Sequence, residues 1–220
     1  MIFAHDTTAA LLLAADLVNS GDAADELTDV AALESFLDQH QVEPRRPATP
    51  ADLDAVRSLR PRLRAIWTAT SPGPLAGLIN GLLRDSGARP WLTDHGGGWG
   101  WHLHVADHDA ALEHRIAAQA GFAFADLVRM GETGRLRRCA APDCDAVLVD
   151  LSKNRSRRYC DTGNCGNRQH VAAYRERRAL RDEALETATA ADAAAEEADE
   201  AAEADEARAG RSPSARPCRT

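Results

Sequence analysis

Residues 139–168 read CAAPDCDAVLVDLSKNRSRRYCDTGNCGNR, and this stretch decides the fold of the second half of the chain. It contains four of the five cysteines, as two close pairs with fifteen residues between them. Each pair is able to present two thiolates to one side of a tight turn, and a short hairpin between the pairs would bring the two turns together. The spacing therefore predicts one structural Zn²⁺ ion, with the ligands Cys139, Cys144, Cys160 and Cys165.

The residues between the cysteines indicate a small treble-clef-like finger. Pro142 and Asp143 suit the first tight turn, and residues 146–150 and 157–159 are predicted to form the two strands of a hairpin. Residues 167–181 have helical periodicity. The finger has too little apolar sequence to fold without its metal, so we expect that loss of zinc unfolds it and leaves the preceding helices folded.

Other roles for the cysteines remain open at the level of the sequence. The four clustered cysteines could form disulfides, which are disfavoured for a chain expected in the reducing cytosol. His170 is an alternative fourth ligand, although two symmetric cysteine pairs suit the spacing better. Cys218 lies in a tail rich in proline and arginine, and we interpret it as a free, exposed thiol.

The sequence before the finger is predicted to be mostly helical, with one hairpin. Thr49, Pro50 and Asp52 form a strong start signal for one helix, which Pro61 is expected to kink or split. A turn at Gly96–Gly98 is expected to join two strands, with Trp99, Trp101, Leu103 and Val105 on one half-buried face. The expected helices are 6–21, 29–40, 50–71, 75–85 and 107–130, and the expected strands are 91–93 and 99–105.

These expectations place the chain in the α+β class, mostly α. A helical N-terminal domain with one β-hairpin is followed by the treble-clef-like four-cysteine finger and by a low-complexity acidic tail. Residues 131–134 read Gly-Glu-Thr-Gly and are interpreted as the hinge between the helical domain and the finger. The predicted domains are 1–131, 135–181 and 182–220.

Charge is segregated along the chain. The formal net charge is −8, but residues 135–181 carry twelve basic and five acidic side chains, and residues 182–206 carry eleven acidic and no basic ones. Such a basic block favours contact with nucleic acid, because arginine matches phosphate oxygens and counterion release drives binding. The predicted contacts with double-stranded DNA are Lys153, Arg155, Arg157, Arg158, Arg168, Arg175, Arg177 and Arg178.

The basic block and the acidic tail have alternative interpretations. The basic residues could form a solvated face or pair with the tail, and Arg168 could instead be buried at the start of its helix and bind Asp150 or a backbone carbonyl. The tail is either disordered or a lone surface helix. Our hypothesis is a disordered tail that competes with DNA for the arginines, and the alternative is a solubilising appendage.

The finger resembles a known family. Cys165-Gly166-Asn167-Arg168 is the signature of the CGNR zinc-finger family, and residues 135–180 are similar to that family over their whole length, including Arg137-Arg138-Cys139 and Tyr159-Cys160. The segment Leu17-Val18-Asn19 and the helices around it resemble the ABATE domain, which usually precedes this finger. The resemblance implies a stress-responsive transcriptional regulator with a C-terminal DNA-binding finger.

The chain departs from the CGNR pattern at three positions. Tyr159 stands where tryptophan is usual, and Val149 stands where phenylalanine is common. Both substitutions keep a packing role. His170 stands where lysine is common, and this removes one phosphate contact that the family pattern would supply.

Composition and motifs restrict the function classes. No nucleophile elbow, phosphate loop or paired-carboxylate site is present, so we expect no enzyme. His102, His104, His108 and His114 are interpreted as exposed residues of the hairpin and its surroundings rather than as metal ligands. The tryptophans are expected in the core, although they could line a pocket for a small-molecule effector of the N-terminal domain.

The expected partners and location follow from these features. Double-stranded DNA is the expected partner, and the alternative is a zinc-stabilised module that binds RNA or protein without DNA specificity. No apolar run approaches the length of a membrane span, so the chain is expected to be cytoplasmic, with no membrane partner. Of the 26 basic residues only one is lysine, which suggests a GC-rich bacterial source. The oligomeric state is not indicated.

Overall fold

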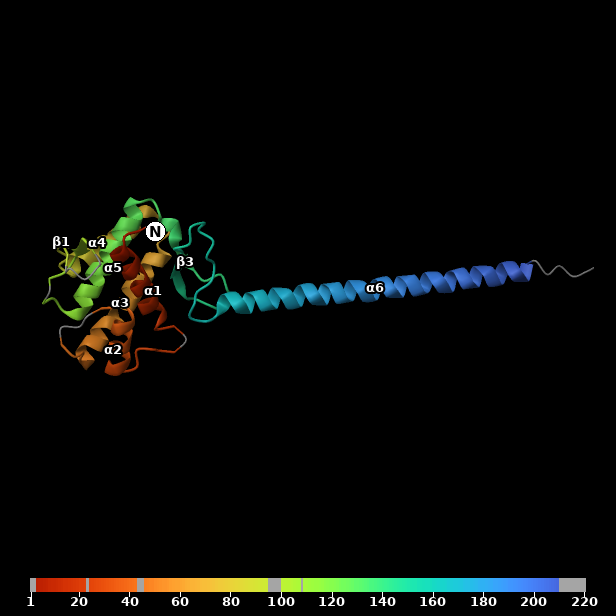
Figure 1. Cartoon of the computed structure of the whole chain (residues 1–220), viewed down its shortest axis with the longest axis horizontal. Helices are drawn as coiled ribbons and strands as arrows, with labels where there is room; N and C mark the ends of the chain where they lie inside the picture. Colours follow the sequence, from red (N-terminus) through yellow and green to blue (C-terminus); the bar gives the residue numbers. More distant parts are fainter. Residues whose placement is uncertain (1–2, 23, 43–45, 95–99, 108, 210–220) are drawn as a thin grey trace, which may run out of the picture. The chain divides into compact units, whose positions relative to one another are not determined.

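The computed structural model of the chain describes residues 3–22, 24–42, 46–94, 100–107 and 109–209 (Figure 1). It confirms the predicted fold class, because helices dominate, two short hairpins are present and four cysteines cluster in the finger. The elements are α1 His5–Asn19, α2 Val30–Gln39, α3 Pro50–Thr68, α4 Pro72–Asp85, β1 Trp91–Thr93, β2 His102–His104, α5 Leu112–Arg129, the 3₁₀ helix η1 Thr133–Arg135, β3 Leu136–Arg138, β4 Val147–Val149 and α6 Cys165–Ala209.

The chain forms two compact units, residues 1–166 and residues 167–220. The first unit contains α1–α5, both hairpins and the first two residues of α6, and the described part of the second unit is the rest of α6. The domain division expected from the sequence, at residues 131–135 and 181–182, stays a prediction. Within the described ranges, no helix is both long and apolar enough to cross a lipid bilayer.

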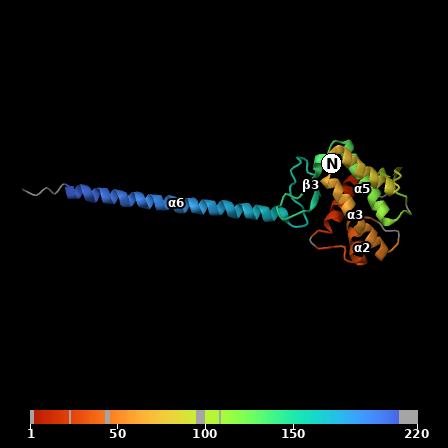
Figure 2. The same cartoon turned by 180° about the vertical axis from the view of Figure 1, so that it is seen from behind.

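The core of the first unit surrounds α1, which packs against α3, α5 and β4 (Figures 1 and 2). Leu11 and Leu17 on α1 are fully buried. Phe124 on α5 is also fully buried, and its ring meets the ring of Trp67 edge to face at a centroid distance of 5.2 Å. Each such side chain contributes about 1.5–3 kcal/mol of burial free energy, so an aromatic-poor sequence can still build this core from leucine.

The start of α3 has the predicted capping box. The Thr49 hydroxyl accepts a hydrogen bond from the Asp52 amide, and the Asp52 carboxylate accepts one from the Thr49 amide at 2.8 Å. The hydrogen bond from Arg46, together with those from Thr49, lowers the pKa of Asp52 to about 2. Helix α3 runs through Pro61 without interruption, so the expectation that this proline splits the helix is wrong.

The other four helices among α1–α5 begin at residues that differ from the prediction, and α2 does so by one residue, at Val30 instead of residue 29. Helix α1 begins at His5 rather than residue 6, and its N-cap Ala4 makes no side-chain hydrogen bond. Helix α4 begins at Pro72 rather than Leu75, because the first helical position needs no amide donor and tolerates proline. Helix α5 begins at Leu112, later than the predicted residue 107.

The first hairpin pairs β1 with β2 over three residues each, with Leu92 opposite Leu103. Val105 is buried as predicted, but the Trp101 side chain is 71% exposed, so its predicted half-buried position is wrong. The reason is Gly100, whose left-handed backbone (φ +67°) turns the chain just before Trp101 and delays the strand until His102. Gly96–Gly98 and Trp99 lie outside the described residues.

The second hairpin pairs β3 with β4, and its strands flank the first cysteine pair. The sequence predicted the strands at 146–150 and 157–159. The first is confirmed as β4, but the second is wrong, since residues 157–159 form no strand and only the Arg158 carbonyl accepts a backbone hydrogen bond, from Ala140. Of the residues predicted as the hinge, Gly131 lies in the turn after α5, and Thr133 and Gly134 already lie in η1, which leads directly into β3.

The outer edge of β4 is held by side chains of the helices. The Asn19 amide donates a hydrogen bond to the Val147 carbonyl at 2.9 Å and accepts one from the Val147 amide at 2.8 Å. The Trp67 indole donates to the Leu148 carbonyl at 3.0 Å. The side chains of Val147 and Val149 belong to the same apolar core as α1, α3 and α5.

Helix α6 continues from the finger through the acidic segment without a break (Figure 1). Its 45 residues correspond to a length of about 67 Å. The hypothesis of a disordered tail is therefore wrong for residues 182–209, which lie in the same helix as Arg168 and Arg175. The backbone hydrogen-bond ladder of a continuous helix prevents its acidic half from folding back onto its basic half.

The first prediction concerns the contact between Asn19 and Val147. Asn19→Ala removes both hydrogen bonds and leaves a buried amide and carbonyl of β4 unpaired, which costs about 1–3 kcal/mol for each group. We expect a lower free energy of unfolding by about 2–4 kcal/mol in chemical denaturation. Gln39→Ala, at an exposed position of α2, is the control and should change stability by less than about 0.5 kcal/mol. Equal midpoints for the two variants would contradict this role of Asn19.

Candidate metal centre

The first cysteine pair lies in the loop that joins β3 to β4. Cys139 directly follows β3, and its amide donates to the Ala146 carbonyl at 2.8 Å. The Cys144 amide donates to the Ala141 carbonyl at 3.2 Å, which closes a tight turn over Pro142 and Asp143. The turn predicted for these two residues thus holds both sulfurs beside the hairpin.

The second cysteine pair closes on the start of α6. Cys160 ends the loop that follows β4, and Cys165 is the first residue of the helix. A Cβ atom at Gly163 would lie 3.1 Å from the Cys165 sulfur, so this close approach of backbone to sulfur favours glycine. The Cys160 amide donates to the Cys139 sulfur at 3.4 Å, and this contact joins the second pair to the first.

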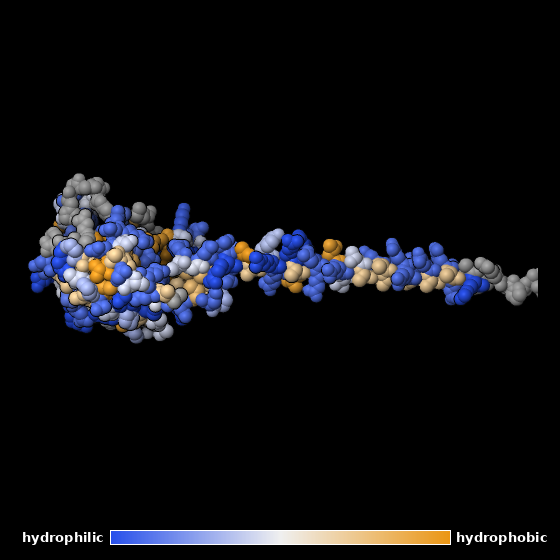
Figure 3. Space-filling view, turned by 90° about the horizontal axis from the view of Figure 1, so that it is seen from below, coloured by the Kyte–Doolittle hydropathy of each residue, from blue (hydrophilic) through white to orange (hydrophobic). Residues whose placement is uncertain are grey.

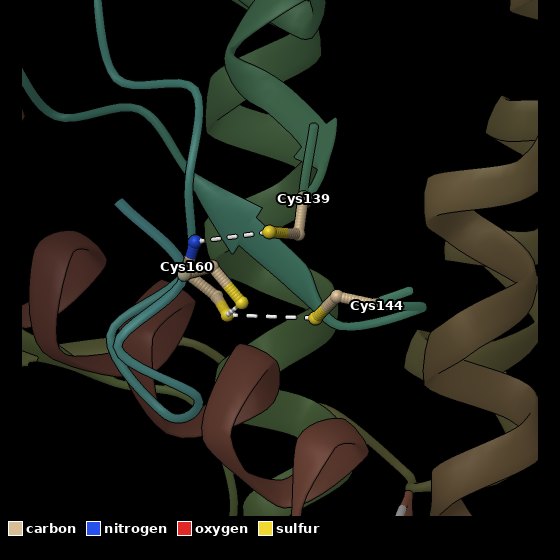
Figure 4. Close-up of side chains that lie close together, drawn as sticks. Cys139, Cys144 and Cys160 are labelled. Atoms are coloured by element: carbon tan, nitrogen blue, oxygen red, sulfur yellow. Dashed lines mark hydrogen bonds between the residues drawn. The ribbon is translucent and has the colours of Figure 1, made fainter. Parts of the chain in front are cut away.

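The four sulfurs converge on one point. All four lie within 4.8 Å of one another, and Figure 4 shows Cys139, Cys144 and Cys160 directed toward each other from separate segments. The Cys144–Cys160 and Cys160–Cys165 sulfur distances are 3.7 and 3.6 Å. Tetrahedral zinc with Zn–S bonds of about 2.3 Å separates its sulfurs by about 3.8 Å. The cysteines therefore fit Zn²⁺, and none of the four forms a disulfide, which was the alternative.

Burial explains why a cation is needed at this point. Cys165 is fully buried, and Cys139 and Cys160 are buried nearly as completely. Burial raises the pKa of the Cys144 thiol to about 12 and also raises the pKa of Cys160. Thiolates at neutral pH are thus unfavourable here unless a metal ion compensates their charge, and protons compete with the metal as the pH falls.

The alternative ligands take no part in this cluster. Among the described residues, the group able to hold a metal consists of the four cysteines and does not include His170. The same holds for His102, His104 and His114, although the rings of His102 and His104 lie 5.2 Å apart on β2. Cys218 and His108 lie outside the described residues.

A buried carboxylate organises the loop between β4 and Cys160. The Asp150 side chain is fully buried and accepts hydrogen bonds from the Ser152 amide at 3.0 Å, the Ser152 hydroxyl at 2.5 Å and the Arg157 amide at 3.0 Å. Arg137 lies 3.3 Å from the same carboxylate. Burial alone would raise the pKa of Asp150, but the contacts with Ser152, Arg137 and Arg157 outweigh it and lower the pKa.

Two arginines, for which the sequence predicts no site role, hold the same loop in place. Arg135 is only 3% exposed and donates to the carbonyls of Asp150 and Ser152 at 2.7 and 3.0 Å. Arg137 donates to the carbonyls of Arg155 and Arg157 at 2.9 and 3.1 Å. These contacts replace the strand pairing predicted for residues 157–159. The spacing of residue types does not predict these contacts, because every residue has a backbone carbonyl that can accept a hydrogen bond.

The predicted nucleic-acid residues fall into two groups, one in each compact unit. Lys153, Arg155 and Arg158 are exposed on the loop, whereas Arg157 is half-buried and paired with Asp161. On α6 the basic residues are all exposed, which differs from the buried position considered for Arg168. The α6 group is Arg168, Arg175, Arg177 and Arg178.

Two of the exposed arginines also contact other side chains. Arg155 pairs with Glu132 at 2.8 Å, and the guanidinium of Arg158 lies 5.8 Å from the ring centroid of Tyr159. Tyr159 thus keeps the packing role expected of an aromatic residue at this position. Exposed ion pairs are worth at most about 1 kcal/mol, so the Glu132 contact leaves Arg155 available to a stronger anion.

Comparison with family models covers most of the chain. Residues 12–131 match the ABATE model, described as "Putative stress-induced transcription regulator", and residues 135–178 match the CGNR zinc finger model. Neither family is one of enzymes. No curated protein matches the sequence. The ABATE match spans more than half of the chain, and the four converging thiols suit the finger that follows it. The chain therefore belongs to the ABATE family and carries a CGNR zinc finger with one structural zinc ion.

Proposed function

We propose that the chain is a transcriptional regulator that binds double-stranded DNA through its zinc finger and the arginines of α6. The observation that carries the proposal is that the basic residues have two different roles in the finger. Arg135 and Arg137 are used inside the finger, and they hold a loop that exposes Lys153, Arg155 and Arg158. The planar guanidinium of arginine suits the geometry of phosphate oxygens, and less side-chain freedom is lost for each hydrogen bond that it forms.

The proposed site has two parts with different roles. Cys139, Cys144, Cys160 and Cys165 hold the zinc ion, which fixes the finger and takes no part in chemistry. Lys153, Arg155, Arg157, Arg158, Arg168, Arg175, Arg177 and Arg178 contact phosphates. Reduced thiols at the zinc ion suit a reducing compartment, so we place the protein in the cytoplasm.

The discriminating experiment measures binding of the zinc-loaded protein to duplex DNA and to structured RNA across a salt series. A DNA-binding regulator should bind duplex DNA more tightly, with a log–log salt slope that reflects several released counterions. A sequence selected from a random duplex pool would then define the operator. Tighter binding to RNA, or binding to neither, would favour the alternative of an RNA-binding or protein-binding module.

We also propose the β1–β2 hairpin as the place where the N-terminal domain binds a small-molecule effector. Trp101 is largely exposed, Trp91 is partly exposed, and the ring of Trp91 lies 5.4 Å from that of His104. Aromatic faces that are not used in the core offer a surface for a flat or cationic ligand. A change in tryptophan fluorescence on ligand addition, abolished by Trp101→Ala, tests this proposal.

The second prediction concerns the metal. Cys160→Ser should lower the zinc content from about one ion per chain toward zero and unfold the finger. Since Val147 and Val149 lie in the helical core, the melting temperature of the helices should fall as well, in contrast to the local unfolding expected from the sequence. Elemental analysis and thermal unfolding measure the two effects, with Cys218→Ser as the control. Full zinc content with an unchanged melting temperature would refute the ligand set.

The third prediction concerns phosphate contacts. Arg175→Ala and Arg178→Ala should each weaken binding to all DNA sequences alike and reduce the salt slope by about 0.9 for each lost contact. Arg89→Ala changes an arginine whose side chain is 77% exposed in the helical part, and it should leave the slope unchanged. If the two α6 variants behave like the Arg89 control, α6 does not contact DNA.

A further inference from the structure

Helix α6 exposes several large apolar side chains. Every described side chain from Tyr174 to Glu206 is exposed, and Tyr174, Leu180 and Leu185 are 58%, 61% and 64% exposed. Figure 3 shows hydrophobic residues among the hydrophilic ones along the surface of this helix. Most helices in proteins depend on the packing of one face against a partner. The length and exposure of α6 therefore raise the question of what packs on it.

The charges of α6 are divided into two blocks of opposite sign. Residues 168–181 carry five arginines and one glutamate, whereas residues 182–206 carry eleven acidic and no basic side chains. The centres of the two blocks lie roughly 30 Å apart along the helix at 1.5 Å per residue. This separation exceeds the Debye length of about 8 Å at physiological ionic strength, so the blocks do not neutralise each other within one helix. Within the described part of α6, an ion pair between the two blocks lies at their junction, where Arg178 is 3.6 Å from Asp182.

A second copy of α6 has the charges that would neutralise both blocks. The helix is continuous, so its own acidic block cannot reach its own basic block by folding back. Parallel pairing of two copies would place the two strongly acidic blocks side by side, which is unfavourable. Antiparallel pairing places each basic block against the acidic block of the other copy.

We propose that α6 forms an antiparallel pair with α6 of a second copy of this chain, centred close to Leu185. In this arrangement residues 168–181 lie opposite residues 190–203, which carry six acidic and no basic side chains. The six are Asp192, Glu196, Glu197, Asp199, Glu200 and Glu203. Each of the two ends of the pair therefore joins a net positive segment to a strongly negative one.

One face of α6 suits this register. Leu180, Ala184, Thr187, Ala191, Ala194 and Ala198 recur at alternating intervals of four and three residues, which is the spacing of a coiled-coil seam. With the pair centred close to Leu185, Leu180 of each copy lies opposite Ala191 of the other. A large side chain against a small one lets the two helices approach closely. The charge blocks set the direction of pairing, and this face supplies the contact. Of the large exposed apolar side chains of α6, Leu180 lies on it, whereas Tyr174 and Leu185 lie on another side of the helix.

The fourth prediction tests this pairing with the zinc-loaded full chain by analytical ultracentrifugation. The wild type should form a dimer whose dissociation constant rises with salt concentration, because the paired charges are exposed. Two variants reverse one block each. The first changes Asp192, Glu196, Glu197, Asp199 and Glu200 to Lys, and the second changes Arg175, Arg177, Arg178 and Arg181 to Glu.

Each variant alone should weaken dimerisation by more than about tenfold, since several exposed charge pairs become repulsive. An equimolar mixture of the two variants should restore a 1:1 heterodimer, because every opposed pair of blocks is then complementary again. The control changes Asp205 and Glu206 to Lys, beyond the paired segment, and should dimerise like the wild type. Circular dichroism checks that each variant stays helical.

Three outcomes would overturn the proposal. The first is a wild type that stays monomeric at low salt at the highest concentration tested. The second is a reversed variant that dimerises as tightly as the wild type. The third is a mixture of helical variants that forms no heterodimer, which would show that the charge blocks do not direct the association.

Discussion

The packing of the finger on the helices depends on the hydrogen bonds of the Asn19 side-chain amide. Strand β4 has only three residues and one neighbour, β3, and a two-stranded hairpin of this size is not stable by itself in water. Asn19 acts as a substitute for a further strand, because its amide satisfies both the donor and the acceptor of Val147. Trp67 satisfies the next carbonyl. The helices thus provide the hydrogen bonds that the sheet lacks.

The two faces of β4 have different roles, because one packs against the cysteine cluster and the other packs against the helices. The Cys139 amide is bonded to Ala146, next to β4, and Leu148 packs in the cysteine cluster, while Val147 and Val149 point into the helical core. Alternation of side chains along a strand is what allows one segment to join both regions. We therefore expect a change at the zinc ion to reach the helices through the three residues of β4, which belong to both regions.

The zinc cluster was predictable because its ligands are cysteines, a rare residue type whose spacing is visible in the sequence. The start of α3 was predictable because Thr49 and Asp52 form hydrogen bonds with each other, only three residues apart. Contacts between distant segments left no such signal. Asn19 was visible only as part of a family segment, and its bond to Val147 spans 128 positions. Arg135 and Arg137 act on carbonyl groups, which every residue has, so residues 157–159 were assigned to a strand that they do not form. Trp101 was assigned to a buried face because alternation was assumed to begin before Gly100, where the backbone turns.

The continuity of α6 connects the two proposals for this helix. The arginines proposed to contact phosphates, Arg175 among them, lie in the block proposed to face the acidic segment of a second copy. DNA and that acidic segment are both polyanions, and one arginine cannot satisfy both at full strength. Pairing of α6 and binding of DNA would then compete, with the balance set by protein concentration as well as by salt. A disordered tail would compete within one chain at any concentration, whereas a continuous helix can compete only through a second molecule.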